Sequence, residues 1–184
     1  MIKYLTKEEL EEGLSSILAS PKDKGVLELI VCRPKENERN VLNTGDLSVS
    51  DGLIGDNWKD RGSKRTADKS SHPEMQLNIM NSRCIHLLTQ DKSRWQLAGD
   101  QLFVDLDLSD DNLPAGTKLE IGSATIEITS IPHLGCRKFI ERFGKPAMLF
   151  VNSEVGKKHN LRGVNAKVIK EGTIKIGDSI RVLH

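Results

Sequence analysis

The stretch PAGTKLEIGSATIEITSI, residues 114–131, decides the fold class. Two runs of alternating apolar residues flank Gly122-Ser123, which is typical of a β-hairpin turn. Residues 172–183, GTIKIGDSIRVL, repeat this pattern and predict a second hairpin that turns at Gly177. Short strands joined by glycine-rich turns, with few helices, favour a closed or partly closed β-barrel.

The rest of the chain adds one helix and further short strands. Thr6 and Glu9 form the pattern of a capping box, and apolar residues at helical spacing predict a helix over residues 7–19. We therefore expect a mainly β protein with a few peripheral helices, a single domain over residues 1–184 and a barrel core at about 24–183. Apolar or alternating runs predict strands in VLELIVC (26–32), EMQLNIM (74–80), CIHLLT (84–89) and LFVDLDL (102–108).

The composition is that of an ordinary globular protein, with 37% hydrophobic and 29% charged residues. A formal net charge of +1 gives no reason to expect a nucleic acid or an anionic membrane as a partner. No apolar run approaches the roughly 20 residues that span a bilayer, and the N-terminal segment is acidic where a secretory signal would be apolar. We therefore expect a cytoplasmic protein. Its three cysteines include no CxxC pair and predict neither a disulfide framework nor a zinc site.

Residues 55–74, GDNWKDRGSKRTADKSSHPE, are polar and predict a long loop. Loops of this length are usually functional lids or disordered segments. A solvated surface loop is the simpler interpretation. In the alternative, its basic side chains bind an anionic ligand; these are Lys59, Arg61, Lys64 and Arg65.

Cys136 differs from the other two cysteines in its surroundings. Cys32 and Cys84 lie in apolar runs, where a buried thiol acts as a small inert hydrophobe. The stretch SIPHLGCRKFIERFGKP, residues 130–146, places Cys136 at the start of a predicted short helix that ends at Gly144. Free backbone N–H groups at a helix start and two adjacent cations would favour the thiolate, which attacks electrophiles or binds metal. An unreactive cysteine in a surface turn stays equally open.

Other candidate residues carry weaker signals. His133 could donate a proton or act as a ligand partner, although a lone histidine in a loop more often does neither. Asp105 and Asp107 share one face of a predicted strand, which would suit a metal or a proton relay; a solvated sheet edge is the simpler interpretation. Arg162 could place a cation at the start of a strand, although most such arginines are surface residues.

Taken together, five segments in order resemble the MOSC domain, a family named for its occurrence at the C-terminus of molybdenum-cofactor sulfurases. The resemblance covers about residues 24–183 and is nearest to stand-alone bacterial members with a Pro-His-x-Gly-Cys motif. The segments are GLIGDNW (52–58), EMQLNIMNSRCIHLL (74–88), LAGDQLFVDLDLSDDNLPAGTKLEIGSATIEIT (97–129), PHLGCRKF (132–139) and LRGVNAKVIKEGTIKIGDSIRV (161–182).

The resemblance implies a MOSC-type β-barrel and a molybdenum cofactor, with Cys136 as the family's cysteine and His133 beside it as a catalytic residue. Cys136 would either ligate molybdenum in a reductase of small N-oxygenated compounds or carry sulfur as a persulfide. The first role needs a redox partner and the second a sulfur donor or acceptor protein. Pyridoxal phosphate binding is also implied. Basic residues that would meet the cofactor are Arg61, Lys64, Arg65, Arg137, Lys138 and Arg162.

Two positions depart from the family pattern. Gly55-Asp56-Asn57 stands where the family has Gly-Asp-Arg, so one possible anion-binding arginine is absent. Asp100-Gln101-Leu102 stands in place of Glu-Asn-Leu. A third function therefore stays open, a non-catalytic module whose barrel pocket holds a small anion and in which Cys136 is incidental.

Overall fold

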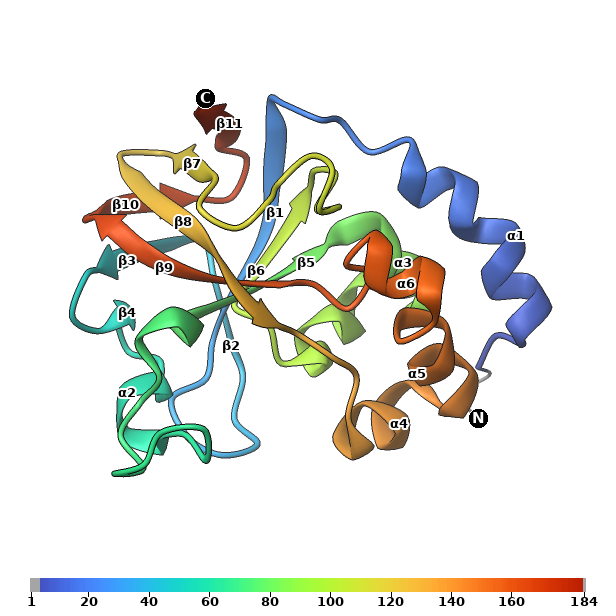
Figure 1. The fold of residues 1–184 in the computed structure, drawn as a ribbon, viewed down its shortest axis with the longest axis horizontal. Coiled ribbons are helices and arrows are strands. Elements are labelled where there is room, and N and C mark those ends of the chain that lie inside the picture. Colours follow the sequence, from blue (N-terminus) through green and yellow to red (C-terminus); the bar gives the residue numbers. More distant parts are fainter. Residues whose placement is uncertain (1–3, 184) are drawn as a thin grey trace.

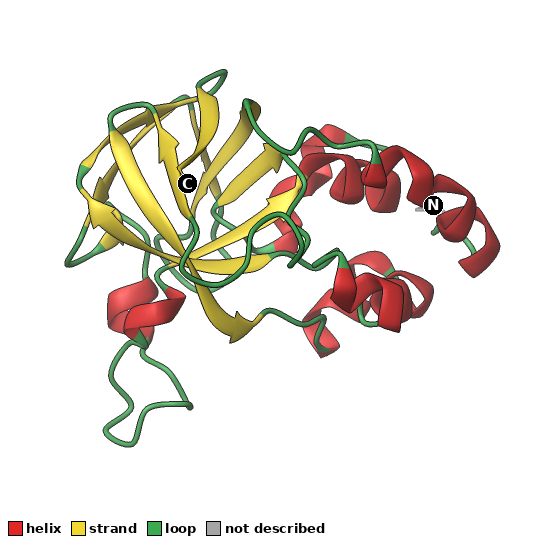
Figure 2. Ribbon diagram, turned by 45° about the horizontal axis from the view of Figure 1, so that its top comes forward, coloured by secondary structure: helices red, strands yellow, loops and turns green. Residues whose placement is uncertain are grey.

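The computed structural model describes residues 4–183 and has a β-barrel at its centre, with most helices packed along one side (Figure 1, Figure 2). Within this range seven strands close into a ring in the order β11-β7-β8-β9-β5-β6-β1, because β11 pairs with β1 as well as with β7. The predicted barrel is therefore confirmed. The ring strands are β1 (Gly25–Cys32), β5 (Leu77–Asn81), β6 (Leu102–Asp105), β7 (Lys118–Ile121), β8 (Ala124–Pro132), β9 (Val164–Lys170) and β11 (Ser179–Leu183).

The remaining elements lie outside the ring. Strand β2 (Asn40–Leu42) pairs with β1, and a three-stranded sheet contains β3 (Thr44–Ser48), β4 (Gly52–Leu53) and β10 (Gly172–Lys175). In the described chain no helix is both long and apolar enough to span a bilayer. The helices are α1 (Lys7–Leu18), α2 (Trp58–Arg61), η1 (Pro73–Met75), α3 (Ser82–Thr89), η2 (Lys92–Ala98), α4 (Arg137–Phe143), α5 (Lys145–Val151) and α6 (Glu154–Lys158).

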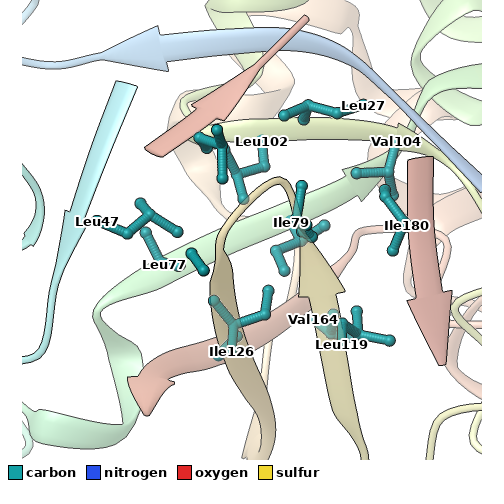
Figure 3. Close-up of a cluster of buried hydrophobic side chains, with 14 of the residues drawn as sticks. Leu27, Leu47, Leu77, Ile79, Leu102, Val104, Leu119, Ile126, Val164 and Ile180 are labelled. Atoms are coloured by element: carbon teal, nitrogen blue, oxygen red, sulfur yellow. The ribbon is translucent and has the colours of Figure 1, made fainter. Parts of the chain in front are cut away.

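Aliphatic side chains fill the barrel. Leu27, Ile79, Leu102, Ile126 and Ile180 come from five different strands and point into the same interior (Figure 3). Each is fully buried, so the interior of the barrel is a packed core.

A second core lies between the barrel and the helices. Successive strand side chains point to opposite faces, and β6 therefore sends Leu102 and Val104 into the barrel but Phe103 toward the helices. Phe139 and Phe143 of α4 join this second core. The helix that follows Cys136 is thus fixed within the second core, beside α5 and η2.

Two local predictions are confirmed. Strands β7 and β8 form the hairpin expected around Gly122. Thr6 and Glu9 form the capping box, because Thr6 N donates to Glu9 Oε2 at 2.7 Å and Glu9 N donates to Thr6 Oγ1 at 3.3 Å. The helix that they start ends at Leu18, with Ala19 as its C-cap.

The strand predicted for CIHLLT is wrong, because this segment belongs to helix α3. Strands β5 and β6 are parallel neighbours, so the chain between them must cross over, and α3 is part of that crossover. Asn81 caps the helix by accepting a hydrogen bond from Cys84 N at 2.9 Å. Cys84, Ile85 and Leu88 then face the second core with helical spacing.

The hairpin predicted for residues 172–183 is also wrong. Strand β10 pairs with β3, whereas β11 pairs with β7 and β1. The turn at Gly177 forms, but it is bound to β1: Gly177 N donates to Leu27 O at 2.8 Å, and Leu27 N donates to Asp178 O at 3.0 Å. These bonds direct the chain from the small sheet into the barrel, so the two strands diverge.

Candidate functional site

A hollow of about 610 Å³ lies among loops that connect the barrel strands with the helices. Its walls come from the loop after β1, from α2, from the end of η2 and from the segment between β8 and α4. Among the described residues, seven cationic side chains line it, against two lining carboxylates, Glu36 and Asp60. Two further carboxylates, Asp56 and Asp100, pair with Arg33 and Arg162, so the hollow keeps an excess of three positive charges. The cations are Arg33, Lys35, Arg39, Arg61, Lys138, Arg142 and Arg162.

Arg33, at the floor of the hollow, is fully engaged within the protein. Its Nε and Nη2 donate to the two carboxylate oxygens of Asp56, both at 2.8 Å. Its Nη1 donates to Gly99 O at 2.7 Å and to Asn78 Oδ1 at 3.2 Å. The side chain is buried, so this arginine serves the fold, and its charge is balanced by the buried carboxylate of Asp56.

Arg162, the second arginine of the floor, is also paired with a buried carboxylate, although its Nε has no hydrogen-bond partner among the described residues. Its Nη1 donates to both carboxylate oxygens of Asp100, at 2.9 and 2.7 Å, and its Nη2 donates to Ala98 O at 3.1 Å. The guanidinium lies 4.9 Å from the ring centre of Phe139, a cation–π contact. Burial raises the pKa of Asp100, and the charge of Arg162 opposes that rise.

His133 lies beside this pair. Its Nδ1 is 3.4 Å from Asp100 Oδ1 but makes no hydrogen bond in the described structure. Burial, and then the charges of Arg162 and Arg33, lower the pKa of His133 well below 6.5, so the imidazole is neutral at pH 7. His133 and Arg162 also line a second hollow of about 620 Å³, and they therefore form the wall between the two hollows.

Arg39, Arg61 and Arg142, at the rim of the hollow, differ from the floor. Within residues 4–183, none of the three forms an ion pair with a carboxylate. Burial is the main cause that lowers the pKa of Arg39, and the charge of Arg142 lowers it further. Burial is also the main cause that lowers the pKa of Arg61, followed by the charge of Arg33. A Cβ on Gly99 would lie 3.6 Å from Arg142 Nη1 and 3.7 Å from Arg39 Nη2, so these two guanidinium groups converge. Like charges gathered without a carboxylate form a site suited to an anion.

Cys136 opens onto this hollow from its edge. It is exposed and is the N-cap residue of α4, so the predicted short helix from Cys136 to Gly144 is present. Its carbonyl accepts hydrogen bonds from Phe139 N at 2.9 Å and Ile140 N at 3.2 Å, whereas its side chain makes no capping bond. The thiol is therefore accessible beside the cationic groups and His133.

The other two cysteines are buried, as predicted. Cys84 Sγ donates to Leu161 O at 3.2 Å, and burial raises the pKa of its thiol to about 12. Burial is also the main cause that raises the pKa of Cys32. Both thiols stay protonated at neutral pH.

The predicted long loop contains more structure than its composition indicated. Asp56 binds Arg33, and Asp56 Oδ1 also accepts a hydrogen bond from Trp58 N at 3.0 Å. Trp58 is buried and begins the short helix α2. The start of the loop is therefore anchored, and it carries Arg61 to the rim of the hollow.

Five of the eight candidate site residues line the hollow: Cys136, His133, Arg61, Lys138 and Arg162. Lys138 Nζ also pairs with Glu36 Oε1 at 3.0 Å.

The other three lie outside the hollow. Arg137 has a side chain that is 92% exposed and pairs with Glu141 at 3.2 Å. Lys64 lines a neighbouring depression with Arg61, beyond the anchored part of the loop, and Arg65 follows it there in sequence.

Sequence reasoning missed Arg33, Arg39 and Arg142 as parts of the site. The first two flank an ordinary polar loop, and Arg142 lies on a helix whose signal was its apolar face. Asp100 was identified only as part of a segment that departs from the family pattern, and not as the partner of Arg162. The metal or relay interpretation of Asp105 finds no support, because Asp105 pairs with Arg83 at 2.8 Å and the described residues contain no cluster of metal-ligating side chains.

Comparisons with known proteins add a family and a set of solved structures. The MOSC domain family model matches residues 88–181. The YuaD protein from Bacillus subtilis is 15% identical, with a TM-score of 0.65 over 86% of this chain and 95% of that chain. YiiM from Escherichia coli is 17% identical, with a TM-score of 0.51 over 86% of this chain and 70% of that chain. At these identities the likeness shows the fold alone. None of the curated proteins matches the sequence significantly.

Proposed function

The chain belongs to the MOSC domain family, and from that premise we propose that the cationic hollow binds a molybdenum cofactor for the reduction of small N-oxygenated compounds. The observation that carries this proposal is a single juxtaposition. An accessible thiol, Cys136, and three arginines that form no ion pair with a carboxylate within residues 4–183 line the same hollow.

The residues present fit such a cofactor. A thiolate is a soft ligand that suits a molybdenum centre, and Cys136 is the exposed cysteine at the hollow. Arg39, Arg61 and Arg142 offer charged donors to a phosphate group, which arginine binds through paired N–H groups. A volume of about 610 Å³ lies within the range of roughly 300–1,000 Å³ that is typical of ligand pockets.

Reduction of an N-hydroxylated compound cleaves its N–O bond. One R–NH–OH takes up two electrons and two protons and yields R–NH₂ and water. When bound, the molybdenum cofactor would supply the two-electron redox chemistry, and the electrons would come from a redox partner protein. The chain itself has to hold the cofactor, admit a small substrate and deliver protons.

His133 is the residue that we assign to proton delivery. Its neutral imidazole can accept a proton at one ring nitrogen and release one from the other. Asp100 lies 3.4 Å from Nδ1 and can stabilise the imidazolium that forms in passing. The second hollow gives His133 a route to solvent that does not cross the cofactor.

Pyridoxal phosphate fits the same hollow less well. Its phosphate could use the rim arginines, but its aldehyde needs a free lysine for a Schiff base. Of the two lysines that line the hollow, Lys138 is engaged with Glu36, which leaves Lys35 for the aldehyde. A pyridoxal phosphate held in this way would give the exposed Cys136 thiol no role. The molybdenum cofactor is therefore the better match to an exposed thiol.

Expression in a host that makes the molybdenum cofactor tests the proposal. We expect molybdenum and pterin to copurify with the native chain near equimolar amounts, and less of both with Cys136→Ser. The loaded protein should reduce an N-hydroxylated amidine with a chemical electron donor. Absence of molybdenum and pterin from the native chain would overturn the proposal. Protein from a cofactor-deficient host is the control.

A sulfur-carrier role is the second candidate. Cys136 is exposed, and its side chain makes no capping hydrogen bond, so another protein can reach the thiol. A donor persulfide would pass its outer sulfur to the Cys136 thiolate and leave as a thiolate. Intact-mass measurement after exposure to such a donor should show one added sulfur in the native chain. An added sulfur that persists in Cys136→Ser would contradict this role.

A further inference from the structure

One side chain, Asn152, holds the loop that carries Cys136. Asn152 Oδ1 accepts a hydrogen bond from Gly135 N at 2.8 Å, and Asn152 Nδ2 donates to Gly135 O at 3.0 Å. Both backbone polar groups of the residue before Cys136 are thus bound by one carboxamide. Asn152 is the C-cap of α5, so this clamp ties the loop to a helix.

Gly135 also lies close to other side chains of this helix. A Cβ on Gly135 would lie 3.2 Å from Val151 Cγ2, 3.3 Å from Asn152 Oδ1 and 3.3 Å from Met148 Cγ. Gly135 does not have a positive φ. A larger residue at this position would therefore be crowded by side chains of α5, whereas the backbone conformation itself does not call for glycine.

The helix that provides the clamp is itself fixed. Ala147, Phe150 and Val151 bury one face of α5 in the second core. Nδ2 of Asn152 also lies 3.3 Å from Met148 Sδ, one turn earlier in the helix. The carboxamide therefore has a defined position to which the loop can be held.

The side chain of Cys136 makes no capping hydrogen bond to the start of α4. The position of the thiol depends on the backbone before it and on the short helix after it. We propose that Asn152 is a positioning residue that keeps the Cys136 thiol at the mouth of the cationic hollow. This inference rests on the proposed function only for the use that the protein makes of the thiol.

Thiol chemistry tests the position without any cofactor. A thiol beside the rim arginines reacts faster with an anionic reagent than with a neutral one, because the local positive potential attracts the anion. The ratio of the rates with the dianionic Ellman reagent and with neutral iodoacetamide therefore reports where the thiol lies. A loss of stability that leaves the protein folded does not move the thiol, so the ratio is compared under conditions in which each variant is folded. Added salt should lower it in the native chain.

Two variants remove the clamp from opposite sides. Asn152→Ala removes both hydrogen bonds, and Gly135→Ala places a methyl group in tight contact with Val151, Asn152 and Met148. We expect Asn152→Ala to lower the rate ratio about tenfold and to weaken its salt dependence, because the thiol leaves the cationic field, and Gly135→Ala to lower the ratio by a smaller factor. Asn112→Ala is the matched control, since Asn112 also donates two hydrogen bonds, to Lys22 O and Asp107 O, away from the hollow.

An unchanged rate ratio in a folded Asn152→Ala protein would overturn the inference. If that variant does not fold, Gly135→Ala decides by the same criterion. An equal fall of the ratio in Asn112→Ala would also overturn it, because the effect would then be general. Failure of molybdenum to bind leaves this result untouched, so the two proposals fail separately.

Discussion

Arginines lie at both the floor and the rim of the hollow, but they differ in whether a carboxylate pairs with them. At the floor, Arg33 and Arg162 are buried and each is paired with a buried carboxylate. At the rim, Arg39 and Arg142 converge over Gly99 without a carboxylate partner in the described chain. The pairing, and not the residue type, separates an arginine that supports the fold from one that is available to a ligand.

The cysteines follow the same division. Cys84 lies below the floor, close enough for the charges of Arg162 and Asp100 to affect its pKa. Cys136 lies at the rim and is exposed. The comparison therefore predicts that changes to the floor affect stability, whereas changes to the rim affect binding and reactivity.

Thiol labelling of the native protein should show the largest difference. We expect Cys136 to react freely and Cys84 to react at least about 10³-fold more slowly, because Cys84 must wait for the protein to open, at a cost of several kcal/mol. Mass spectrometry of labelled peptides measures both rates. Comparable labelling of Cys84 and Cys136 in folded protein would break the division between floor and rim.

Removal of a floor carboxylate should cost the most stability. Asp100→Leu leaves Arg162 buried without its partner, and breaking such a pair costs about 3–5 kcal/mol. Arg142→Gln at the rim removes no ion pair of the described chain and one exposed hydrogen bond, from Nη1 to Leu97 O, so it should cost about 1 kcal/mol or less. Urea unfolding of both variants measures this difference. Equal losses would show that the rim arginine is structural too.

Anion binding should depend on the rim. Arg39→Gln combined with Arg142→Gln should weaken the binding of inorganic pyrophosphate about tenfold or more, because each charged hydrogen bond contributes about 1.5–3 kcal/mol. Isothermal calorimetry at fixed ionic strength gives the dissociation constants. Arg181→Gln is the control, since Arg181 is a surface residue paired with Glu120. A similar loss in Arg181→Gln would mean that only net charge matters.

The smallest effect concerns pH. Because the folded-state pKa of His133 lies below its unfolded value of about 6.5, the unfolded chain binds the extra proton as the pH falls. The contribution of His133 to the free energy of unfolding is therefore fully present above pH 6.5. It falls below that pH by at most about 1.4 kcal/mol per pH unit. His133→Gln should flatten the dependence of unfolding free energy on pH between 5 and 6.5. The same flattening in His86→Gln, on the exposed face of α3, would contradict this assignment.

The barrel could be predicted because alternation of apolar residues is a local signal, and the β7–β8 hairpin needs only adjacent strands. Prediction failed where pairing is not local. Strands β10 and β11 follow one another but pair with different partners, and α3 is a helix because the parallel strands on either side require a crossover.

The site residues likewise fall into those that a local motif could identify and those that only the fold brings together. Cys136 and His133 are three residues apart in one recognisable motif, so both could be identified from the sequence. The arginines come from separate segments that only the fold brings together. Arg137 and Arg142 lie on the same short helix, but five residues turn the side-chain direction by about 140°, so one points to solvent and the other reaches the hollow.

Molybdenum-edge X-ray absorption of cofactor-loaded protein tests the central claim most directly, namely that the rim of the hollow holds a molybdenum cofactor through Cys136. We predict that Cys136→Ser either loses the metal or retains it with one sulfur ligand fewer than the native protein. Full retention of molybdenum with an unchanged sulfur shell would contradict the account, because Cys136 would then take no part in holding the metal.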